Sequence, residues 1–149
     1  MKSIAIGCDH AAYSFKLEVI TYLQSLGYEV KDFGPFSEDR VDYPDYAIKV
    51  SEAVASGEFE KGILICGTGV GMSITANKVK GVRAVVCTEP YSAKMSREHN
   101  NANVLCFGAR VIGIEMAKMI IDAWIETEFA GGRHADRVAK IISYEKEKR

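Results

Sequence analysis

Gly62-Ile63-Leu64-Ile65-Cys66, a short apolar run, leads directly into the glycine-rich loop Gly67-Thr68-Gly69-Val70-Gly71. A continuous apolar run of this length that ends at a turn signal is typical of a strand buried on both faces. A helical pattern follows the loop and extends to about Val79. The stretch therefore predicts a strand, a tight loop and a helix, which is the repeating unit of an α/β fold.

The same alternation of apolar runs and helical patterns continues on both sides of this stretch. Further apolar runs predict strands at residues 3–8, 28–33, 82–87 and 104–107. Strands that are apolar throughout and are joined by helices form parallel sheets covered on both faces. We therefore predict one domain over residues 1–149. It is an α/β fold: a doubly wound three-layer αβα sandwich with a five-stranded parallel, Rossmann-like sheet.

The composition argues against several classes of partner. The chain has 149 residues, of which 48% are hydrophobic and 26% charged, and its net charge is −1. A net charge this small predicts no general attraction to nucleic acid or to a membrane surface. The sequence has no apolar run long enough to span a bilayer and no signal-peptide pattern at its start. We therefore expect a cytoplasmic protein.

Four cysteines, Cys8, Cys66, Cys87 and Cys106, are spread along the chain. They form no C-x-x-C pair and no zinc-type cluster with histidine, so we expect no metal site. A reducing compartment also argues against disulfides. Buried core positions are the plain interpretation of such cysteines.

Polar and glycine residues follow the predicted strands at the positions where doubly wound folds bind ligands, beyond the carboxyl ends of the strands. They are Asp9 and His10 after the first strand, Cys66 and residues 67–71 after the third, Glu89 after the fourth and Arg110 after the fifth. His99 closes the helix that starts at Pro90, between the fourth and fifth strands. We expect the fold to gather most of these positions on one rim of the sheet.

The glycine-rich loop predicts an anion site. Three glycines in five residues let backbone N–H groups turn inward against an anion, and the next helix adds its positive end. The loop lacks the Gly-Lys-Ser/Thr ending of a Walker loop, and Met72 occupies the third glycine position of a dinucleotide fingerprint. Glu89 nevertheless keeps a nucleotide interpretation open, because a ribose-binding acid would lie there. A tight turn without any ligand is the structural alternative.

Cys66 and His99 each have a chemical and a structural interpretation. N–H groups and a helix N-terminus stabilise a thiolate, so Cys66 could act as a base or a nucleophile. A cysteine that ends an apolar strand is otherwise a core residue. Asp9 could serve catalysis, cap the next helix, or do both. His99 could be no more than a polar helix end.

The segment Gly131-Gly132-Arg133-His134-Ala135-Asp136-Arg137 is the best phosphate candidate. Arg133 and Arg137 are four residues apart and share one helix face, and paired guanidinium groups suit a phosphate dianion. A solvated basic face paired with Asp136 is an equal alternative on spacing alone. Arg110 is a third possible anion contact.

Four segments of the chain together closely resemble the ribose-5-phosphate isomerase B family of sugar-phosphate isomerases. The matching segments are Gly7-Cys8-Asp9-His10-Ala11-Ala12, Cys66-Gly67-Thr68-Gly69-Val70-Gly71, Arg97-Glu98-His99-Asn100-Asn101-Ala102-Asn103-Val104-Leu105 and Gly131-Gly132-Arg133-His134. They keep their order and span nearly the whole chain, which makes the match more specific than any single motif.

The resemblance implies an enzyme that interconverts D-ribose 5-phosphate and D-ribulose 5-phosphate without a metal or nucleotide cofactor. It also implies a homodimer, or a dimer of dimers, with sites shared between subunits. By match to the family motifs, Cys66 is the base that moves a proton between C2 and C1 through an enediolate. In part of the family a carboxylate replaces this cysteine, so Cys66 assigns the chain to the cysteine branch.

The resemblance assigns the other site residues as well. Residues Gly67, Thr68, Gly69, Val70 and Gly71 bind the enediolate oxygen through backbone N–H groups, with Thr68 assisting. His99 resembles the ring-opening acid or base, Asp9 its polar partner on the sugar, and Asn100 a substrate contact. His10, Arg110, Arg133 and Arg137 would hold the phosphate.

Two alternatives stay open beside this hypothesis. Relatives act on hexose 6-phosphates such as allose 6-phosphate or galactose 6-phosphate. Galactose 6-phosphate isomerases use two different subunits, and a complete residue set in one chain disfavours that case. A nucleotide-binding module built on the loop and Glu89 is the alternative from another class, and Met72 counts against it.

Overall fold

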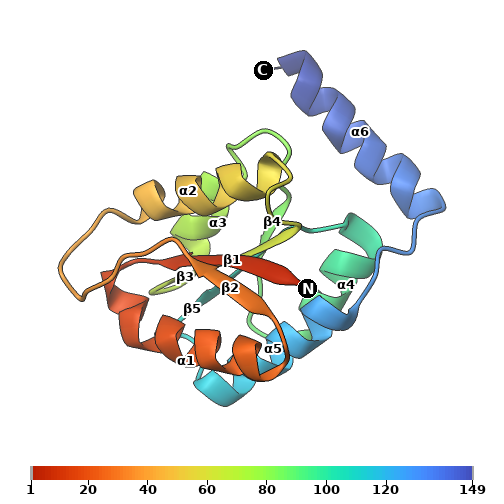
Figure 1. The fold of residues 1–149 in the computed structure, drawn as a ribbon. Helices are drawn as coiled ribbons and strands as arrows, with labels where there is room; N and C mark the ends of the chain where they lie inside the picture. Colours follow the sequence, from red (N-terminus) through yellow and green to blue (C-terminus); the bar gives the residue numbers. More distant parts are fainter. Residues whose placement is uncertain (1, 149) are drawn as a thin grey trace.

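A five-stranded sheet lies at the centre of the computed structural model, which describes residues 2–148 (Figure 1). Its strands are β1 (Ser3–Cys8), β2 (Glu29–Asp32), β3 (Lys61–Cys66), β4 (Ala84–Val86) and β5 (Val104–Gly108). They follow the order β2-β1-β3-β5-β4, and every neighbouring pair is parallel. The predicted doubly wound parallel sheet of five strands is therefore confirmed.

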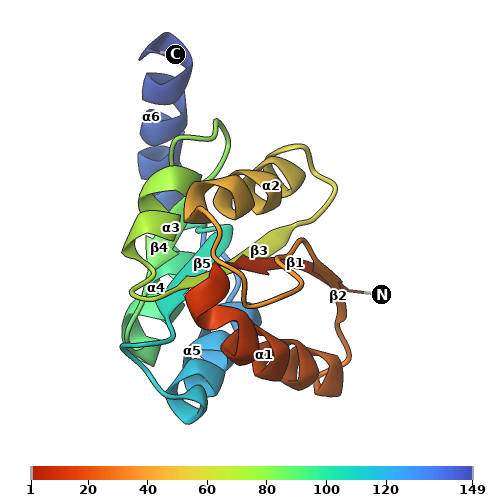
Figure 2. The same cartoon turned by 90° about the vertical axis from the view of Figure 1, so that its left-hand side faces the viewer.

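Helices cover both faces of the sheet and complete the three predicted layers (Figures 1 and 2). One face carries α1 (Tyr13–Ser25), α4 (Pro90–Asn100) and α5 (Ile114–Glu126), and the other carries α2 (Tyr43–Ala55) and α3 (Val70–Ala76). A 3-10 turn, η1 (His10–Ala12), lies between β1 and α1. Because both faces are covered, β1, β3 and β5 are buried along almost their whole length, which explains why they are apolar throughout.

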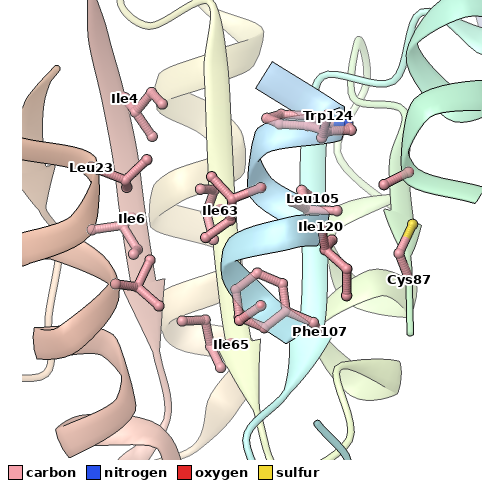
Figure 3. Close-up of a cluster of buried hydrophobic side chains, with 14 of the residues drawn as sticks. Ile4, Ile6, Leu23, Ile63, Ile65, Cys87, Leu105, Phe107, Ile120 and Trp124 are labelled. Atoms are coloured by element: carbon pink, nitrogen blue, oxygen red, sulfur yellow. The ribbon is translucent and has the colours of Figure 1, made fainter. Parts of the chain in front are cut away.

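The larger half of the core lies between the sheet and the layer of α1 and α5 (Figure 3). Isoleucines of β1 and β3 pack there with Phe107 of β5 against Leu23 of α1 and Ile120 of α5. Trp124 of α5 is fully buried at one end of this cluster, close to α4. The packing fixes the ends of the central strands, from which the candidate site residues project.

The opposite face of the sheet packs against α2 at short range. A Cβ atom added at Gly62 would lie 2.8 Å from a methyl group of Val50 and 3.0 Å from one of Val54, both in α2. Contacts of this length are too short for carbon atoms, so glycine is needed for α2 to approach β3. The close approach brings the first turn of α2 to the glycine-rich loop after β3.

Helix α3 is shorter than the sequence predicted, because it ends at Ala76 and not near Val79. The side chain of Asn77 pairs with both backbone groups of Ala84: its Nδ2 donates to the carbonyl at 2.9 Å and its Oδ1 accepts from the amide at 2.8 Å. These bonds tie the end of α3 to the edge strand β4. The helix stops where this long-range contact begins, and sequence periodicity carries no signal for such a contact.

The last helix, α6 (Arg133–Lys148), extends away from the sandwich (Figure 1). Val138 is buried, and the Glu145 carboxylate accepts hydrogen bonds from the Gly81 amide at 3.1 and 3.3 Å. Ile141 and Tyr144 remain 54% and 64% exposed. The helix therefore keeps an apolar surface that its own chain does not cover.

Candidate active site

The switch in strand order places β1 and β3 side by side, so their carboxyl ends lie together at the point where such folds bind ligands. The amide of Asp9 donates to the carbonyl of Ile65 at 3.1 Å, which fixes Asp9 beside Cys66. The Asp9 carboxylate in turn accepts a hydrogen bond from the Ala12 amide at 3.2 Å. Asp9 is therefore a cap for η1, and this bond also fixes its carboxylate at the carboxyl end of β1.

His10 is held by the long connection between β2 and α2. Its Nδ1 atom accepts a hydrogen bond from the Val41 amide at 3.1 Å. A neutral imidazole that accepts at Nδ1 carries its proton on Nε2. The Val41 amide therefore selects the tautomer in which His10 offers an N–H donor at Nε2.

A buried lysine of α1 binds the start of the same connection between β2 and α2. Lys16 is fully buried, and its ammonium donates to the Asp32 carboxylate at 2.8 Å and to the Pro35 carbonyl at 2.6 Å. The carbonyl of Gly34 accepts from the Cys8 amide at 3.1 Å. These bonds attach the start of the connection to α1 through Lys16 and to the end of β1 through Cys8, next to Asp9 and His10.

The sulfur of Cys66 lies inside the glycine-rich loop. Cys66 is only 5% exposed, and its Sγ atom accepts a hydrogen bond from the Gly69 amide at 3.0 Å. The Thr68 hydroxyl oxygen accepts from the Val70 amide at 3.2 Å. The Val70 amide is therefore directed at the Thr68 hydroxyl, and the Gly69 amide is directed at the thiol of Cys66.

Two glycines in the loop are required by close contacts. Gly69 has a φ of +83°, and a Cβ atom added there would lie 2.8 Å from the backbone of Phe107. A Cβ atom added at Gly71 would lie 2.5 Å from the ring of Tyr43, which starts α2. The loop is thus pressed between β5 and α2, and its shape is set by neighbours from two other elements.

Arg110 lies on the same rim as Cys66. Its amide donates to the Gly67 carbonyl at 3.0 Å, and the Ala109 amide donates to the Cys66 carbonyl at 2.9 Å. The Arg110 side chain passes within 3.6 Å of the Cβ position of Gly67. We call the group made of Asp9, His10, Cys66, residues 67–71 and Arg110 the Cys66 rim.

Glu89 belongs to the same edge of the sheet but has a structural role. Its carboxylate accepts a hydrogen bond from the Ser92 amide, at 3.0 and 3.1 Å from its two oxygens, and so caps α4. Hydrogen bonding from Ser92 lowers the pKa of Glu89. Capping of α4 is therefore a sufficient explanation for an acidic residue at position 89, without the ribose-binding role that the sequence left open.

The other three cysteines are core residues, as the plain interpretation predicts. Cys8, Cys87 and Cys106 are buried and free. Burial raises the pKa of Cys8 to about 12, that of Cys87 to about 12, and that of Cys106 well above its usual value. They are therefore protonated at neutral pH.

His99 is the exception to the expected gathering of residues on one rim. Helix α4 runs back across the sheet, and the loop after it reaches the start of β3, where the Asn103 carbonyl accepts from the Gly62 amide at 3.0 Å. The five residue steps from Lys61 to Cys66, at about 3.3 Å each, separate the two ends of β3 by about 16 Å. His99 and Asn100 therefore lie at the opposite edge of the sheet from Cys66.

The start of α6 joins His99 at this opposite edge. The rings of His99 and His134 stack with centroids 4.1 Å apart and planes inclined by 12°. Desolvation and the nearby charges of His99, Arg133 and Arg137 lower the pKa of His134. We call the group made of His99, Asn100, Arg133, His134 and Arg137 the His99 unit.

Three features of this site were not predicted from the sequence. They are the hydrogen bond from the Val41 amide to His10, the Tyr43 ring beside Gly71, and the burial of the Arg97 side chain near His99. Val41 lies in a connection without periodicity, so no pattern marked it. Tyr43 could have been suspected, because Pro44 already places it in the first turn of a helix at this edge.

Within residues 2–148, no helix is both long and apolar enough to cross a membrane. In the same part of the chain, no group of three or more His, Cys, Asp or Glu side chains could hold a metal ion.

Known proteins are similar to this chain over nearly its whole length. The family model described as Ribose/Galactose Isomerase matches residues 4–141. The chain is 57% identical over 145 residues to ribose-5-phosphate isomerase B of Escherichia coli, covering 97% of both proteins. It is 50% identical over 147 residues to a D-erythrulose-4-phosphate isomerase of Pectobacterium atrosepticum, covering 97% of this chain and 96% of that protein.

A solved structure of ribose-5-phosphate isomerase B from Clostridium thermocellum superposes with a TM-score of 0.96 at 55% sequence identity, and 99% of each chain is covered. The chain therefore belongs to the Ribose/Galactose Isomerase family and is an aldose–ketose isomerase, as the resemblance implied.

Proposed function

We propose that this isomerase interconverts D-ribose 5-phosphate and D-ribulose 5-phosphate through an enediolate, with Cys66 as the proton-transferring base. The observation that carries the proposal is the hydrogen bond from the Gly69 amide to the Cys66 sulfur, 3.0 Å long, at the carboxyl edge of the sheet. An N–H group directed at sulfur suits a thiolate, which is the form that can take up a proton. The high identity to a ribose-5-phosphate isomerase B supports the choice of substrate.

The reaction needs one proton carrier and a stabilised oxygen. Cys66 removes the proton from C2 of the open-chain aldose, and the electron pair moves toward the C1 carbonyl to give the enediolate. The thiol then returns the proton to C1, while the hydroxyl proton passes from O2 to O1, so no atoms are gained or lost. Backbone amides of residues 67–71 stabilise the negative oxygen, and the Thr68 hydroxyl assists.

The remaining candidates bind and prepare the sugar. Ribose 5-phosphate is a furanose in water, so a ring must open before C2 becomes acidic. His99 is the proposed acid or base for ring opening, and Asp9 and Asn100 are the proposed contacts to the sugar. The proposed phosphate site is formed by His10, Arg110, Arg133 and Arg137, and it fixes the reacting carbons by binding the distant end of the substrate.

The complete site requires two copies of the chain. Within one copy the Cys66 rim and the His99 unit lie at opposite edges of the sheet, about 16 Å apart along β3 and too far for one pentose phosphate. A homodimer, or a dimer of dimers, in which the His99 unit of one copy meets the Cys66 rim of the other would restore the site. The apolar side chains of Ile74 on α3 and Ile141 on α6, 59% and 54% exposed, are candidates for burial between copies.

The proposed location is the cytoplasm, where the enzyme would act in carbohydrate metabolism on the pentose phosphates. Free cysteines at positions 8, 66, 87 and 106 are consistent with a reducing compartment. No cofactor is required by the proposed chemistry, because the proton carried by Cys66 returns to the same substrate.

A second candidate function is the isomerisation of another sugar phosphate. The relative from Pectobacterium atrosepticum is named for erythrulose 4-phosphate, so half-identical chains in this family differ in substrate length. Allose 6-phosphate and galactose 6-phosphate are the hexose alternatives.

A coupled assay with each of these sugar phosphates separates the candidates. We expect the highest kcat/KM with D-ribose 5-phosphate, because the proposal gives its phosphate and its C1–C2 unit separate binding groups. Turnover confined to a tetrose or hexose phosphate would remove the pentose assignment and leave the isomerase chemistry in place.

A further inference from the structure

The side chain of Arg97 is a buried guanidinium that the proposed mechanism does not use. Arg97 lies in α4, two residues before His99, and is only 7% exposed. Its guanidinium carbon lies 5.9 Å from the ring centre of the fully buried Trp124 of α5. Removing a charged side chain from water is unfavourable, so a buried guanidinium needs specific hydrogen-bond partners.

The partners of Arg97 lie on two separate segments. On one side, its Nη1 atom donates to the Asn101 side-chain oxygen at 3.1 Å and to the Ala102 carbonyl at 2.5 Å. On the other side, its Nε atom donates to the Thr127 carbonyl at 3.3 Å. Arg97 therefore joins the residues that end α4 to the beginning of the connection between α5 and α6.

These two segments hold His99 between them. Asn101 ends α4 in the left-handed conformation with a φ of +50°, so the last turn of α4 closes directly after His99. The connection from Thr127 runs to Ala130, whose amide donates to the Glu98 carbonyl at 3.0 Å, and then to His134, whose ring stacks on His99. The His99 ring therefore contacts both segments: it stacks on His134, and its Nε2 atom lies 3.3 Å from the carboxylate of Glu98 in α4.

We propose that Arg97 is the positioning residue for His99: its guanidinium fixes the last turn of α4 and the α5–α6 connection as one rigid body, and this body orients the His99 ring. The inference rests on the proposed function, because it requires that His99 act in the reaction. Arg97 itself touches no substrate in this account. A fork of several donors in one plane suits acceptors on two segments, which the single ammonium of lysine cannot bridge in the same geometry.

The test is a double-mutant cycle in the full chain with Arg97→Lys, His99→Asn and the double variant, assayed with D-ribose 5-phosphate. We expect Arg97→Lys to lower kcat about tenfold with little change in KM, since small misplacements of a catalytic group have effects of this order or larger. His99→Asn should lower kcat about a hundredfold. The double variant should be no slower than His99→Asn, because residues that act as a unit are non-additive.

Arg83→Lys is the matched control. Arg83 is a partly buried arginine whose Nε atom donates to the Asn101 carbonyl at 2.8 Å, so it binds the end of α4 as Arg97 does. We expect its kcat to stay within about twofold of wild type. Thermal unfolding of each variant ensures that turnover is compared below the onset of unfolding.

Asn101→Gly serves if Arg97→Lys does not fold. Glycine accepts the positive φ of this position and removes one acceptor of Arg97 without leaving a changed buried charge. We expect a loss of about threefold in kcat that disappears in the His99→Asn background.

The outcomes of the cycle separate the role of Arg97 from that of His99. Wild-type kcat in Arg97→Lys, or an equal loss with and without His99, would overturn the positioning role and leave the proposed function intact. Wild-type turnover in His99→Asn would instead contradict the role of His99, and the inference about Arg97 would fall with it.

Discussion

The Cys66 rim and the His99 unit are built in different ways. The rim is held by backbone groups: the amide of Asp9 bonds to β3, that of Arg110 to the glycine-rich loop, and that of Gly69 to the thiol. The His99 unit is held by side chains, through the Arg97 fork and the stacked ring of His134. A site formed at strand ends follows from the fold, whereas a site formed at a helix end needs dedicated residues to fix it.

The two regions also carry complementary chemistry. The rim contains the thiol and the amide loop, which suit proton transfer beside a developing negative charge. The His99 unit contains imidazoles and two of the three candidate phosphate arginines. The proposed base lies only in the rim and the proposed ring-opening group only in the His99 unit, and this separation is the physical basis for expecting a second copy of the chain.

Removal of the thiol should have the largest effect on turnover. Cys66→Ala deletes the proposed proton carrier, so we expect kcat with ribose 5-phosphate to fall about 10³-fold while substrate still binds. The measurements are a coupled assay and calorimetric titration with the sugar phosphate.

Cys106→Ala is the control for this prediction, because Cys106 is a buried cysteine on the neighbouring strand with a raised pKa. We expect it to lose about 1 kcal/mol of stability and little kcat. If Cys66→Ala keeps a turnover within tenfold of wild type, the rim has another base.

Combining two inactive chains in one oligomer should give the next largest change, a recovery of turnover from the low level of both parents. Cys66→Ala and His99→Asn chains with different tags are produced together, and the mixed oligomer is purified through both tags. In a dimer with shared sites one of the two sites is then intact, so we expect about half of the wild-type turnover per dimer. A mixed oligomer as inactive as its parents would mean that both regions serve the same site within one chain.

Distortion of the loop should have a smaller effect on turnover. Gly69→Ala adds a Cβ atom 2.8 Å from the Phe107 backbone at a φ of +83° and displaces the amide that bonds to Cys66. We expect kcat to fall about a hundredfold, because the Cys66 sulfur loses the N–H group that stabilises its thiolate.

Gly27→Ala is the matched control for the backbone strain alone, because Gly27 has a φ of +92° and nothing within 4 Å of its Cβ position. It should cost about 1 kcal/mol of stability with kcat unchanged. Equal losses of activity in the two variants would argue against a special function of the Gly69 amide.

The smallest effect is expected for a single phosphate contact in the His99 unit. Arg133→Gln removes one charged hydrogen-bond donor, so we expect KM for ribose 5-phosphate to rise about tenfold with kcat nearly unchanged. Lys140→Gln, an exposed cation further along α6, is the control and should leave KM unchanged. An unchanged KM in Arg133→Gln would favour the alternative of a solvated basic face.

The chemistry of the rim could be predicted because it is local. Cys66 and the loop are adjacent in sequence, and the carboxyl ends of parallel strands meet at one edge, so the positions of Asp9, His10 and Arg110 follow from the fold class. The position of His99 could not be deduced from periodicity, because its helix returns to the opposite edge of the sheet. The early end of α3 at Ala76 was missed for a similar reason, since a contact with β4 decides it.

The sequence by itself determined the αβα sandwich, the family and the residue types of the candidate site, because apolar periodicity, turn residues and short motifs are local signals. Only the tertiary structure decided that the Gly69 amide bonds to the Cys66 sulfur, that the Val41 amide selects the tautomer of His10, and that Arg97 joins the two segments around His99. It also decided that Cys66 and His99 lie at opposite edges of the sheet within one chain. The physical reason is that hydrogen bonds and packing between distant segments depend on distances that no spacing along the chain encodes.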